Sequence, residues 1–120
     1  MKTILVDAVY CFVIEKDDTF GIFEEMQKLL DSFSNRKIIL TGANDEQFQK
    51  FGLENMPYEV FTLKHNPEKS DPNYYQKMLQ HFSLEKDDVI YFEHDENAVK
   101  SAQSIGIKTY HYDNDKKDLV

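Results

Sequence analysis

Apolar runs and amphipathic stretches alternate along the chain. Three short runs, at residues 4–6, 38–40 and 89–92, consist only of apolar or aromatic residues, as is typical of strands that are buried on both faces. A weaker run, in which polar residues partly alternate with apolar ones, predicts another strand over 58–63. A last strand is expected to end near Tyr110, so the pattern predicts about five strands in all.

Stretches with helical periodicity lie between these runs. Apolar residues recur every three or four positions over 20–30, which predicts an amphipathic helix there. A short helix is expected over 44–51, and a longer one over 71–82 begins at an Asp-Pro pair, which suits a helix start because the aspartate caps free N–H groups. A fourth helix is expected over 96–104.

Strands that alternate with helices imply a parallel sheet that is covered by helices on both faces. The expected fold class is therefore α/β, a Rossmann-like three-layer sandwich with a parallel sheet of about five strands. In this interpretation residues 1–112 form one core domain, because a chain of 120 residues leaves little room for a second core. The polar residues 113–120 are expected to form a C-terminal tail.

Charge and composition limit the classes of ligand and the cellular compartment that we expect for this chain. With 14 Lys and Arg against 22 Asp and Glu, the net charge of −8 disfavours binding to nucleic acid or to an anionic membrane surface. No apolar run approaches the roughly 20 residues of a membrane helix, and Asp7 interrupts an N-terminal run too short for a signal peptide. The single cysteine, Cys11, excludes an internal disulfide and fits a reducing compartment, so we expect a cytoplasmic domain.

Polar residues follow several of the predicted strands, at the sheet edge where ligands bind in such folds. Asp7 ends the first strand, and its carboxylate can serve as a nucleophile and as a cation ligand. Thr41 with Gly42, and Lys69 in a later loop, can bind phosphoryl oxygens. Glu93 adds an oxygen ligand of the kind that Mg²⁺ prefers. Each of these residues alone would also be normal in a turn, at a helix start or in a solvated loop. Only their order along the chain therefore indicates a functional site.

That order resembles the four motifs of the haloacid dehalogenase-like (HAD) hydrolases over residues 2–110. The apolar strand that ends in Asp7 resembles the first motif, and the strand that ends in Thr41 resembles the second. Lys69-Ser70-Asp71-Pro72 resembles the third motif, a lysine shortly before a helix. Residues 89–107 resemble the fourth motif, which is an apolar strand followed by acidic residues, a helix and a Gly-Ile turn.

The resemblance implies a Rossmann-like HAD fold with a small hairpin over 10–19 and a phosphatase-type hydrolase that uses Mg²⁺. In such an enzyme the aspartate attacks phosphorus and forms an aspartyl-phosphate, which water then hydrolyses. The residues implied are Asp7, Thr41 and Lys69 for catalysis, Thr41, Gly42 and Lys69 for phosphate binding, and Asp7, Val9 (through its backbone carbonyl) and Glu93 for the metal.

Two positions depart from the family pattern. Val9 stands where HAD phosphatases have a second aspartate that protonates the leaving alcohol and activates water. Since general acid–base catalysis typically contributes roughly 10²–10⁴-fold, we expect weakened activity. Glu93 and His94 replace the usual paired aspartates, and neutral histidine is a poor magnesium ligand. The start of the motif also resembles the dehalogenase branch of the family, whose halide leaving group needs no proton.

Two functions therefore stay open, a weakened hydrolase and a non-catalytic domain that binds a phosphorylated ligand or a protein partner. The segment between Asp7 and Thr41 has room only for a hairpin and one helix, and after Lys69 the chain enters the next helix. We thus expect no cap domain at either usual position. An uncapped site does not exclude water, so a phosphorylated substrate or a partner protein is expected to cover it.

Overall fold

A five-stranded parallel sheet forms the centre of the computed structural model, which describes residues 2–112. The strand order is β5–β4–β1–β6–β7, and every neighbouring pair is parallel. The α/β fold and the five strands expected from the sequence are confirmed. The strands are β1 (Thr3–Asp7), β4 (Lys37–Thr41), β5 (Glu59–Thr62), β6 (Val89–Glu93) and β7 (Lys108–His111).

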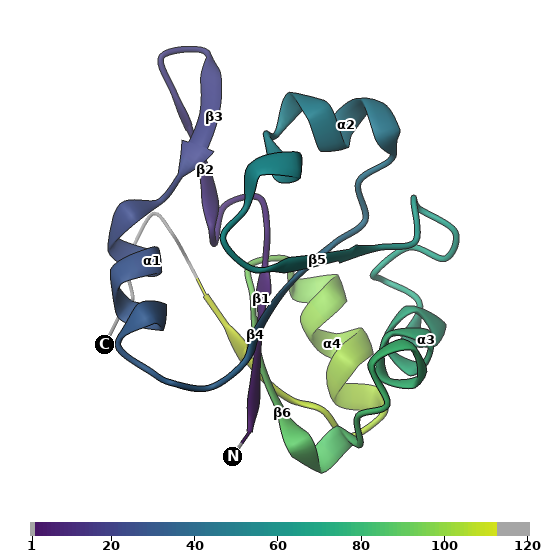
Figure 1. Ribbon diagram of the computed structural model, residues 1–120. Helices are drawn as coiled ribbons and strands as arrows, with labels where there is room; N and C mark the ends of the chain where they lie inside the picture. Colours follow the sequence, from purple (N-terminus) through teal and green to yellow (C-terminus); the bar gives the residue numbers. More distant parts are fainter. Residues whose placement is uncertain (1, 113–120) are drawn as a thin grey trace.

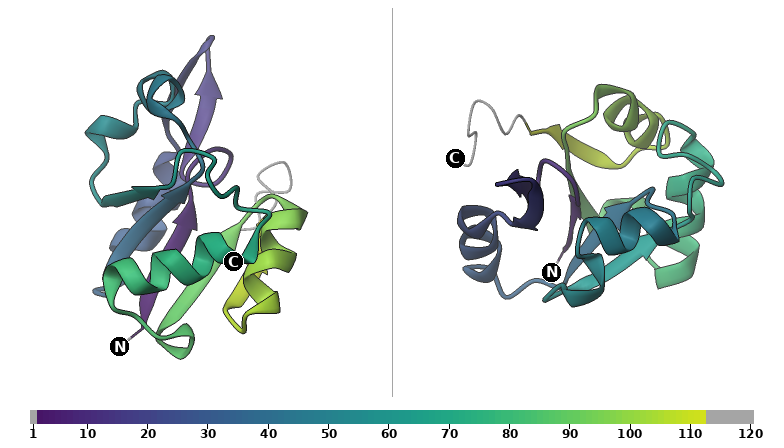
Figure 2. Two further views of the ribbon diagram at one scale, coloured as in Figure 1. Left: turned by 90° about the vertical axis from the view of Figure 1, so that its right-hand side faces the viewer. Right: turned by 90° about the horizontal axis from the view of Figure 1, so that it is seen from above.

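Helices cover the sheet on both sides. Helix α1 lies on one side of the sheet and helices α3 and α4 lie on the other, which gives three layers (Figure 1). The view from above shows the same separation (Figure 2). The helices are α1 (Glu24–Asp31), α2 (Asp45–Lys50), α3 (Pro72–Phe82) and α4 (Glu96–Ser104), with short 3₁₀ turns η1 (Leu53–Asn55) and η2 (Lys86–Asp88).

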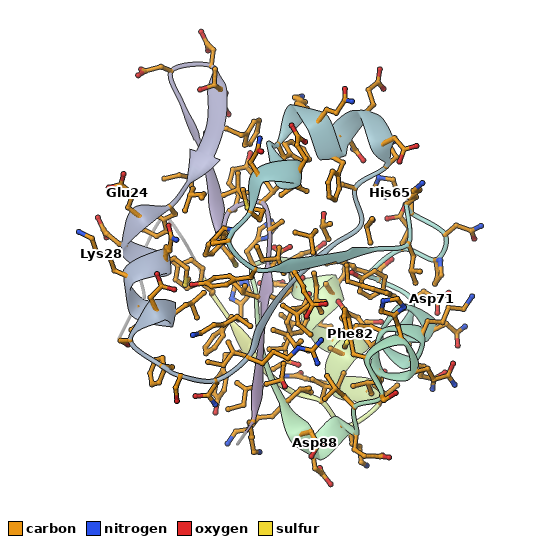
Figure 3. The ribbon with its side chains drawn as sticks, in the orientation of Figure 1. Glu24, Lys28, His65, Asp71, Phe82 and Asp88 are labelled. Carbon is orange, nitrogen blue, oxygen red and sulfur yellow. The ribbon has the colours of Figure 1, made fainter. Side chains whose placement is uncertain are left out.

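Alternate side chains of the central strand β1 pack into two separate hydrophobic cores, one on each face of the sheet. Ile4 and Val6 of β1 pack in the cluster that contains Met26 and Leu30 of α1. Leu5, between them, points the other way into the cluster formed with α3 and α4. This alternation is the normal geometry of a strand, in which successive side chains face opposite sides of the sheet. The outer face of α1 is charged, and Glu24 and Lys28 project away from the sheet (Figure 3).

The helix expected over 20–30 is shorter than predicted. Residues up to Ile22 belong to an antiparallel hairpin made of β2 (Val13–Lys16) and β3 (Thr19–Ile22), and α1 begins only at Glu24. The expected hairpin over 10–19 is present but extends beyond its predicted end. The cause is the turn, because Asp17 and Asp18 both adopt positive φ angles, 48° and 66°. Such two-residue turns match the twist of paired strands, so the chain continues as a strand after them.

The other elements begin and end close to their predicted positions. Asn44, Asp71 and Asp95 cap α2, α3 and α4, each with a side-chain oxygen that accepts a backbone N–H. These bonds satisfy donors that a helix start leaves free. The predicted tail over 113–120 lies outside the described residues. Within residues 2–112, no helix is both long enough and apolar enough to cross a membrane.

Candidate active site

The register of the sheet places two acidic residues side by side at its carboxyl edge. Leu5 of β1 pairs with Tyr91 of β6, and the next pair along is Val6 with Phe92. One step further, Asp7 and Glu93 end their strands. Both lie two positions beyond residues of the α3–α4 core, so both side chains lie on that face of the sheet. Asp7 is 4% exposed and Glu93 is fully buried.

Lys69, which precedes α3, joins these two carboxylates. Its Nζ donates to Asp7 Oδ1 at 2.5 Å and lies 2.6 Å from Glu93 Oε1. The backbone carbonyl of Leu40 lies 3.5 Å from the same nitrogen. The Lys69 side chain is 13% exposed, so its charge is largely removed from solvent. Three residues that the sequence placed in the site are therefore in direct contact.

Thr41 and Gly42 lie beside this contact, at the end of β4. Leu40 pairs with Asp7 across the sheet, and Thr41 is the next residue. Thr41 Oγ1 accepts the backbone N–H of Ala43 at 3.1 Å, and its carbonyl accepts the Tyr74 hydroxyl at 2.7 Å. The two residues are thus held at the same edge of the sheet as Asp7.

A histidine that the sequence analysis gave no role, His65, borders this edge. It lies in the loop after β5, on the side of α2 (Figure 3). A Cβ atom added to Gly42 would lie 3.4 Å from His65 Nδ1. The ring also contacts Gln47 of α2, with His65 Nε2 2.5 Å from Gln47 Oε1.

His94, directly after β6, was expected only to be a poor magnesium ligand, but it contacts both carboxylates. Its Nδ1 lies 2.5 Å from Asp7 Oδ2 and 3.3 Å from Glu93 Oε2. The ring meets Tyr10 edge to face, with centroids 5.3 Å apart. Its place next to Glu93 in the fourth motif was the available signal. Asp7, Lys69, Glu93 and His94 are called the charged quartet from here on.

Glu93 is held at every oxygen. Oε1 accepts the Tyr91 hydroxyl and faces Lys69. Oε2 accepts the backbone N–H groups of His94 and Asp95, at 3.0 and 3.1 Å. Hydrogen bonds to the charged form favour ionisation of a carboxyl group. Glu93 is therefore a fixed anion, whereas the Asp7 carboxylate oxygens are contacted by the Lys69 ammonium and the His94 ring.

The pKa shifts of the two carboxyl groups run in opposite directions. Burial and the neighbouring Glu93 raise the pKa of Asp7 to about 6, although Lys69 and His94 oppose the shift. Burial alone would also raise the pKa of Glu93, but Lys69 and the hydrogen bonds to its carboxylate outweigh burial and hold that pKa well below its usual range.

The two bases of the quartet stay protonated. Hydrogen bonds to Asp7 and Glu93 raise the pKa of His94 to about 10, against the effect of burial. Burial lowers the pKa of Lys69, but the same two carboxylates outweigh it and the net shift is upward. At neutral pH the quartet therefore contains two anions and two cations and is balanced in charge.

Val9 and Cys11 follow β1, and Cys11 borders the quartet. Val9 is half-buried and packs against the core on the α1 side. Cys11 is fully buried, and ligand atoms of Asp7, Cys11 and His94 lie within 4.8 Å of one another. Burial, followed by the charges of Asp7 and Glu93, raises the pKa of the Cys11 thiol. The thiol is therefore held in its protonated, weakly reactive form.

Magnesium at Asp7, Val9 and Glu93 is what the family resemblance implies, and the observed contacts do not favour it. Every carboxylate oxygen of Asp7 and Glu93 already accepts a hydrogen bond or faces a cation. Mg²⁺ needs near-octahedral oxygen ligands and dehydrates reluctantly. Here an imidazole nitrogen stands between the two carboxylates. The residues as they stand do not fit magnesium.

A cavity of about 690 Å³ lies elsewhere, between α1 and strands β1, β6 and β7. Its lining is mostly apolar and includes Met26, Leu30, Phe92 and Tyr110. None of the quartet residues lines it, so the chemistry of the site and this cavity are separate features.

Comparisons with known proteins agree with this fold. A family profile described as haloacid dehalogenase-like hydrolase matches residues 13–111, so the match begins after Asp7. A HAD family enzyme from Bacteroides thetaiotaomicron, solved as an Asp-to-Ala mutant with magnesium and inorganic phosphate, superposes with a TM-score of 0.71 at 12% identity and covers 92% of this chain and 93% of its own.

A candidate β-phosphoglucomutase from Thermotoga maritima superposes with a TM-score of 0.67 at 14% identity, covering 92% of this chain and 85% of its own. At these identities the similarity to solved structures concerns the fold. No curated protein matches the chain.

Proposed function

Because the chain belongs to the haloacid dehalogenase-like hydrolase family, we propose that its charged quartet is the site of a weak phosphatase-type hydrolase. One observation carries the proposal, the contact of the Lys69 ammonium with Asp7 and Glu93 at 2.5 and 2.6 Å. A buried ammonium beside a carboxylate nucleophile can also stabilise the charge of a transferring phosphoryl group. Thr41, at the same edge, adds a hydroxyl for a phosphoryl oxygen.

The reaction would run in two steps. Asp7 attacks the phosphorus of a phosphate monoester, the bond from phosphorus to the leaving oxygen breaks, and an aspartyl-phosphate forms. Water then attacks phosphorus, which releases inorganic phosphate and restores the carboxylate. Both Asp7 oxygens are hydrogen-bonded, to Lys69 and to His94, so one of these contacts must pass to the incoming phosphoryl group before attack.

Val9 decides which substrates suit this site. Its side chain has no proton to give, so the leaving oxygen departs as an anion unless water protonates it. Phenolic and acyl phosphates, whose leaving groups are stable anions, are therefore better substrates than alkyl phosphates. This is the physical basis for the weak activity that we propose.

The structural relatives support a phosphorylated ligand. The Bacteroides enzyme was solved with inorganic phosphate, and the Thermotoga protein is named as a candidate for an enzyme of phosphorylated glucose. The Bacteroides structure also holds magnesium. In this chain, however, Lys69 and His94 already supply the positive charge beside the carboxylates. The proposal therefore contains no step that involves a metal.

We further propose that the site works without a cap. Between β1 and β4 the described chain forms only the hairpin and α1, and from Lys69 it passes directly into α3. A large phosphorylated substrate or a partner protein would then close the site against water. The free thiol of Cys11 suits a reducing compartment such as the cytoplasm.

A second candidate, a non-catalytic domain that binds a phosphorylated ligand or a protein partner, has its own support. Val9 removes the acid–base group, and the resting hydrogen bonds of Asp7 leave neither oxygen free for attack. Fold membership alone does not establish turnover, because activity depends on the site.

Trapping the phosphoenzyme separates the two candidates. Acetyl phosphate and p-nitrophenyl phosphate are incubated with the chain, and intact mass is measured for the gain of one phosphoryl group. We expect the gain in the wild type and its loss in Asp7→Asn, with Asp87→Asn as an exposed control that keeps it. Phosphate binding at Thr41 and Lys69 without a phosphoenzyme would favour the non-catalytic domain. If the chain neither binds phosphate nor forms a phosphoenzyme, both candidate functions are contradicted.

A further inference from the structure

We propose that His94 takes the place of a divalent cation between Asp7 and Glu93, so that this site is held together without magnesium. The inference deepens the proposed function and rests on it for the class of ligand, a phosphate group. Its metal-binding part stands on the contacts of the quartet alone.

Nδ1 of His94 is the donor in its hydrogen bond to Asp7. Nδ1 of His94 lies 2.5 Å from Asp7 Oδ2 and 3.3 Å from Glu93 Oε2. Ionised carboxylates only accept hydrogen bonds, so Nδ1 must carry the proton. A nitrogen that carries a proton has no free lone pair for a metal. The contact exists for the imidazolium and for the neutral Nδ1–H tautomer alike, so it does not depend on titration.

The His94 ring is fixed in its position by its neighbours. Its edge-to-face contact with Tyr10 holds one side, with centroids 5.3 Å apart. The backbone of His94 is fixed at both ends, because its N–H donates to Glu93 at 3.0 Å and its carbonyl lies 2.7 Å from His111 Nε2. The side chain is 36% exposed, so it lies at the mouth of the site while its Nδ1 points inward.

The two carboxylates of the quartet already have nitrogen partners where a metal ion would bind. Two neighbouring carboxylates with one cation would leave an uncompensated buried charge, which is costly and is what usually draws a metal ion into such a site. Nζ of Lys69 lies beside Asp7 Oδ1 and Glu93 Oε1, and Nδ1 of His94 lies beside Asp7 Oδ2 and Glu93 Oε2, so each of the four carboxylate oxygens already faces a nitrogen donor, whichever protonation state His94 has. A magnesium ion would have to displace the His94 ring and would then face the Lys69 ammonium, so the driving force for binding is small.

The test is a magnesium titration of the wild-type chain without substrate. Backbone amide shifts of Asp7 and Glu93 are followed by NMR, and the unfolding temperature is measured in parallel. We expect no saturable shift and no rise in unfolding temperature at millimolar Mg²⁺. Saturable shifts at these two residues would overturn the inference, whatever the variants show.

The variant His94→Asp tests the residue itself. It replaces the donor with carboxylate oxygens, so we expect it to gain Mg²⁺ binding and a magnesium-dependent rise in unfolding temperature that the wild type lacks. His81→Asp on α3 makes the same substitution away from the quartet and is expected to gain neither. A folded His94→Asp chain that still ignores magnesium would overturn the assignment of His94.

Zinc provides a further discriminating outcome. Asp7, Cys11 and His94 offer oxygen, sulfur and nitrogen ligand atoms within 4.8 Å of one another. Tight Zn²⁺ binding that His94→Asn and Cys11→Ser each abolish would mean that His94 is a metal ligand and would overturn the inference. We expect no such binding.

The phosphoenzyme experiment keeps this inference separate from the proposed function. A chain that binds no magnesium and forms no phosphoenzyme would remove the proposed function and support the role of His94. A phosphoenzyme that forms only in the presence of magnesium would support the function and overturn the inference. A phosphoenzyme whose yield EDTA leaves unchanged would support both.

Discussion

The Lys69 ammonium lies 2.5 Å from the Asp7 carboxylate, although 62 positions separate the two residues in the sequence. Asp7 ends the central strand, and Lys69 reaches it from the loop before α3, past the carbonyl of Leu40. Both side chains are largely buried. In such a buried pair each charge stabilises the opposite charge of its partner, which the protein interior alone would solvate poorly.

Replacing Lys69 by methionine removes this compensation and leaves Asp7 and Glu93 as neighbouring buried carboxyl groups. Breaking one side of a buried pair typically costs about 3–5 kcal/mol. We expect a loss of this order in the free energy of unfolding, measured by urea denaturation at neutral pH. The deficit should shrink in mild acid, because protonation of the carboxyl groups then removes their repulsion.

Lys100→Met on the exposed surface of α4 is the control, and it should change the stability by no more than about 0.5 kcal/mol. An equally small effect of Lys69→Met would contradict the contact geometry of the quartet. A loss that does not depend on pH would point to packing rather than charge.

Tyr91→Phe tests how Glu93 is held. The Tyr91 hydroxyl donates to Glu93 inside the core, and hydrogen bonds to charged groups contribute about 1.5–3 kcal/mol. We expect a loss in that range by urea denaturation. Tyr75→Phe removes a hydroxyl 3.3 Å from that of Tyr91, a bond between neutral groups, so its cost should be nearer 0.5–1.5 kcal/mol, about half as much. Equal losses in the two variants would argue against a special role for Glu93.

Much of the fold could be predicted because its signals are local. The apolar runs gave the strands, and caps such as Asp71 gave the helix starts, since both depend on residues a few positions apart. The convergence of Asp7, Lys69 and Glu93 could also be anticipated, because parallel strands end at one edge of the sheet. Their catalytic roles stay predictions, whereas their observed contacts do not fit the predicted magnesium site.

The remaining features could not be predicted because the sequence pattern allows two local conformations and does not show which one the folded chain adopts. Phe20 fits the helical spacing, but the positive φ angles of Asp17 and Asp18 continue the chain as a strand. Whether His94 points into the site or into solvent depends on the positions of Asp7 and Tyr10, which lie more than 80 residues away along the chain. Its role therefore appears only when the quartet is assembled in space.

Val9→Asp should restore the missing acid–base group. If the rest of the site is competent, we expect the rate on alkyl phosphates to rise by up to roughly 10²–10⁴-fold, and the rate on p-nitrophenyl phosphate to rise less, since its leaving group needs little protonation. Steady-state kcat/KM on both substrate types is the measurement. Val9→Asn is the control, because asparagine is similar in size to aspartate but cannot act as a general acid. A folded Val9→Asp chain with no gain would show that more than this group is missing.

His94 should also make stability depend on pH. Its pKa is raised from the ordinary 6.5 to about 10 in the folded chain, so the folded state holds this proton more tightly than the unfolded state does. The stabilisation is complete below pH 6.5 and is lost as the pH rises towards 10. The pKa of Asp7, about 6, lies below this window, so its titration does not mask the effect.

We therefore expect the free energy of unfolding of the wild type, measured with urea, to fall between neutral and alkaline pH. In His94→Asn this part of the slope should disappear, because the substituted side chain does not titrate. His81→Asn, on the outer part of α3 and away from the quartet, should retain the wild-type slope. If His94→Asn keeps the full slope, another group must release the proton, and the contact of His94 with Asp7 does not control the stability of the site.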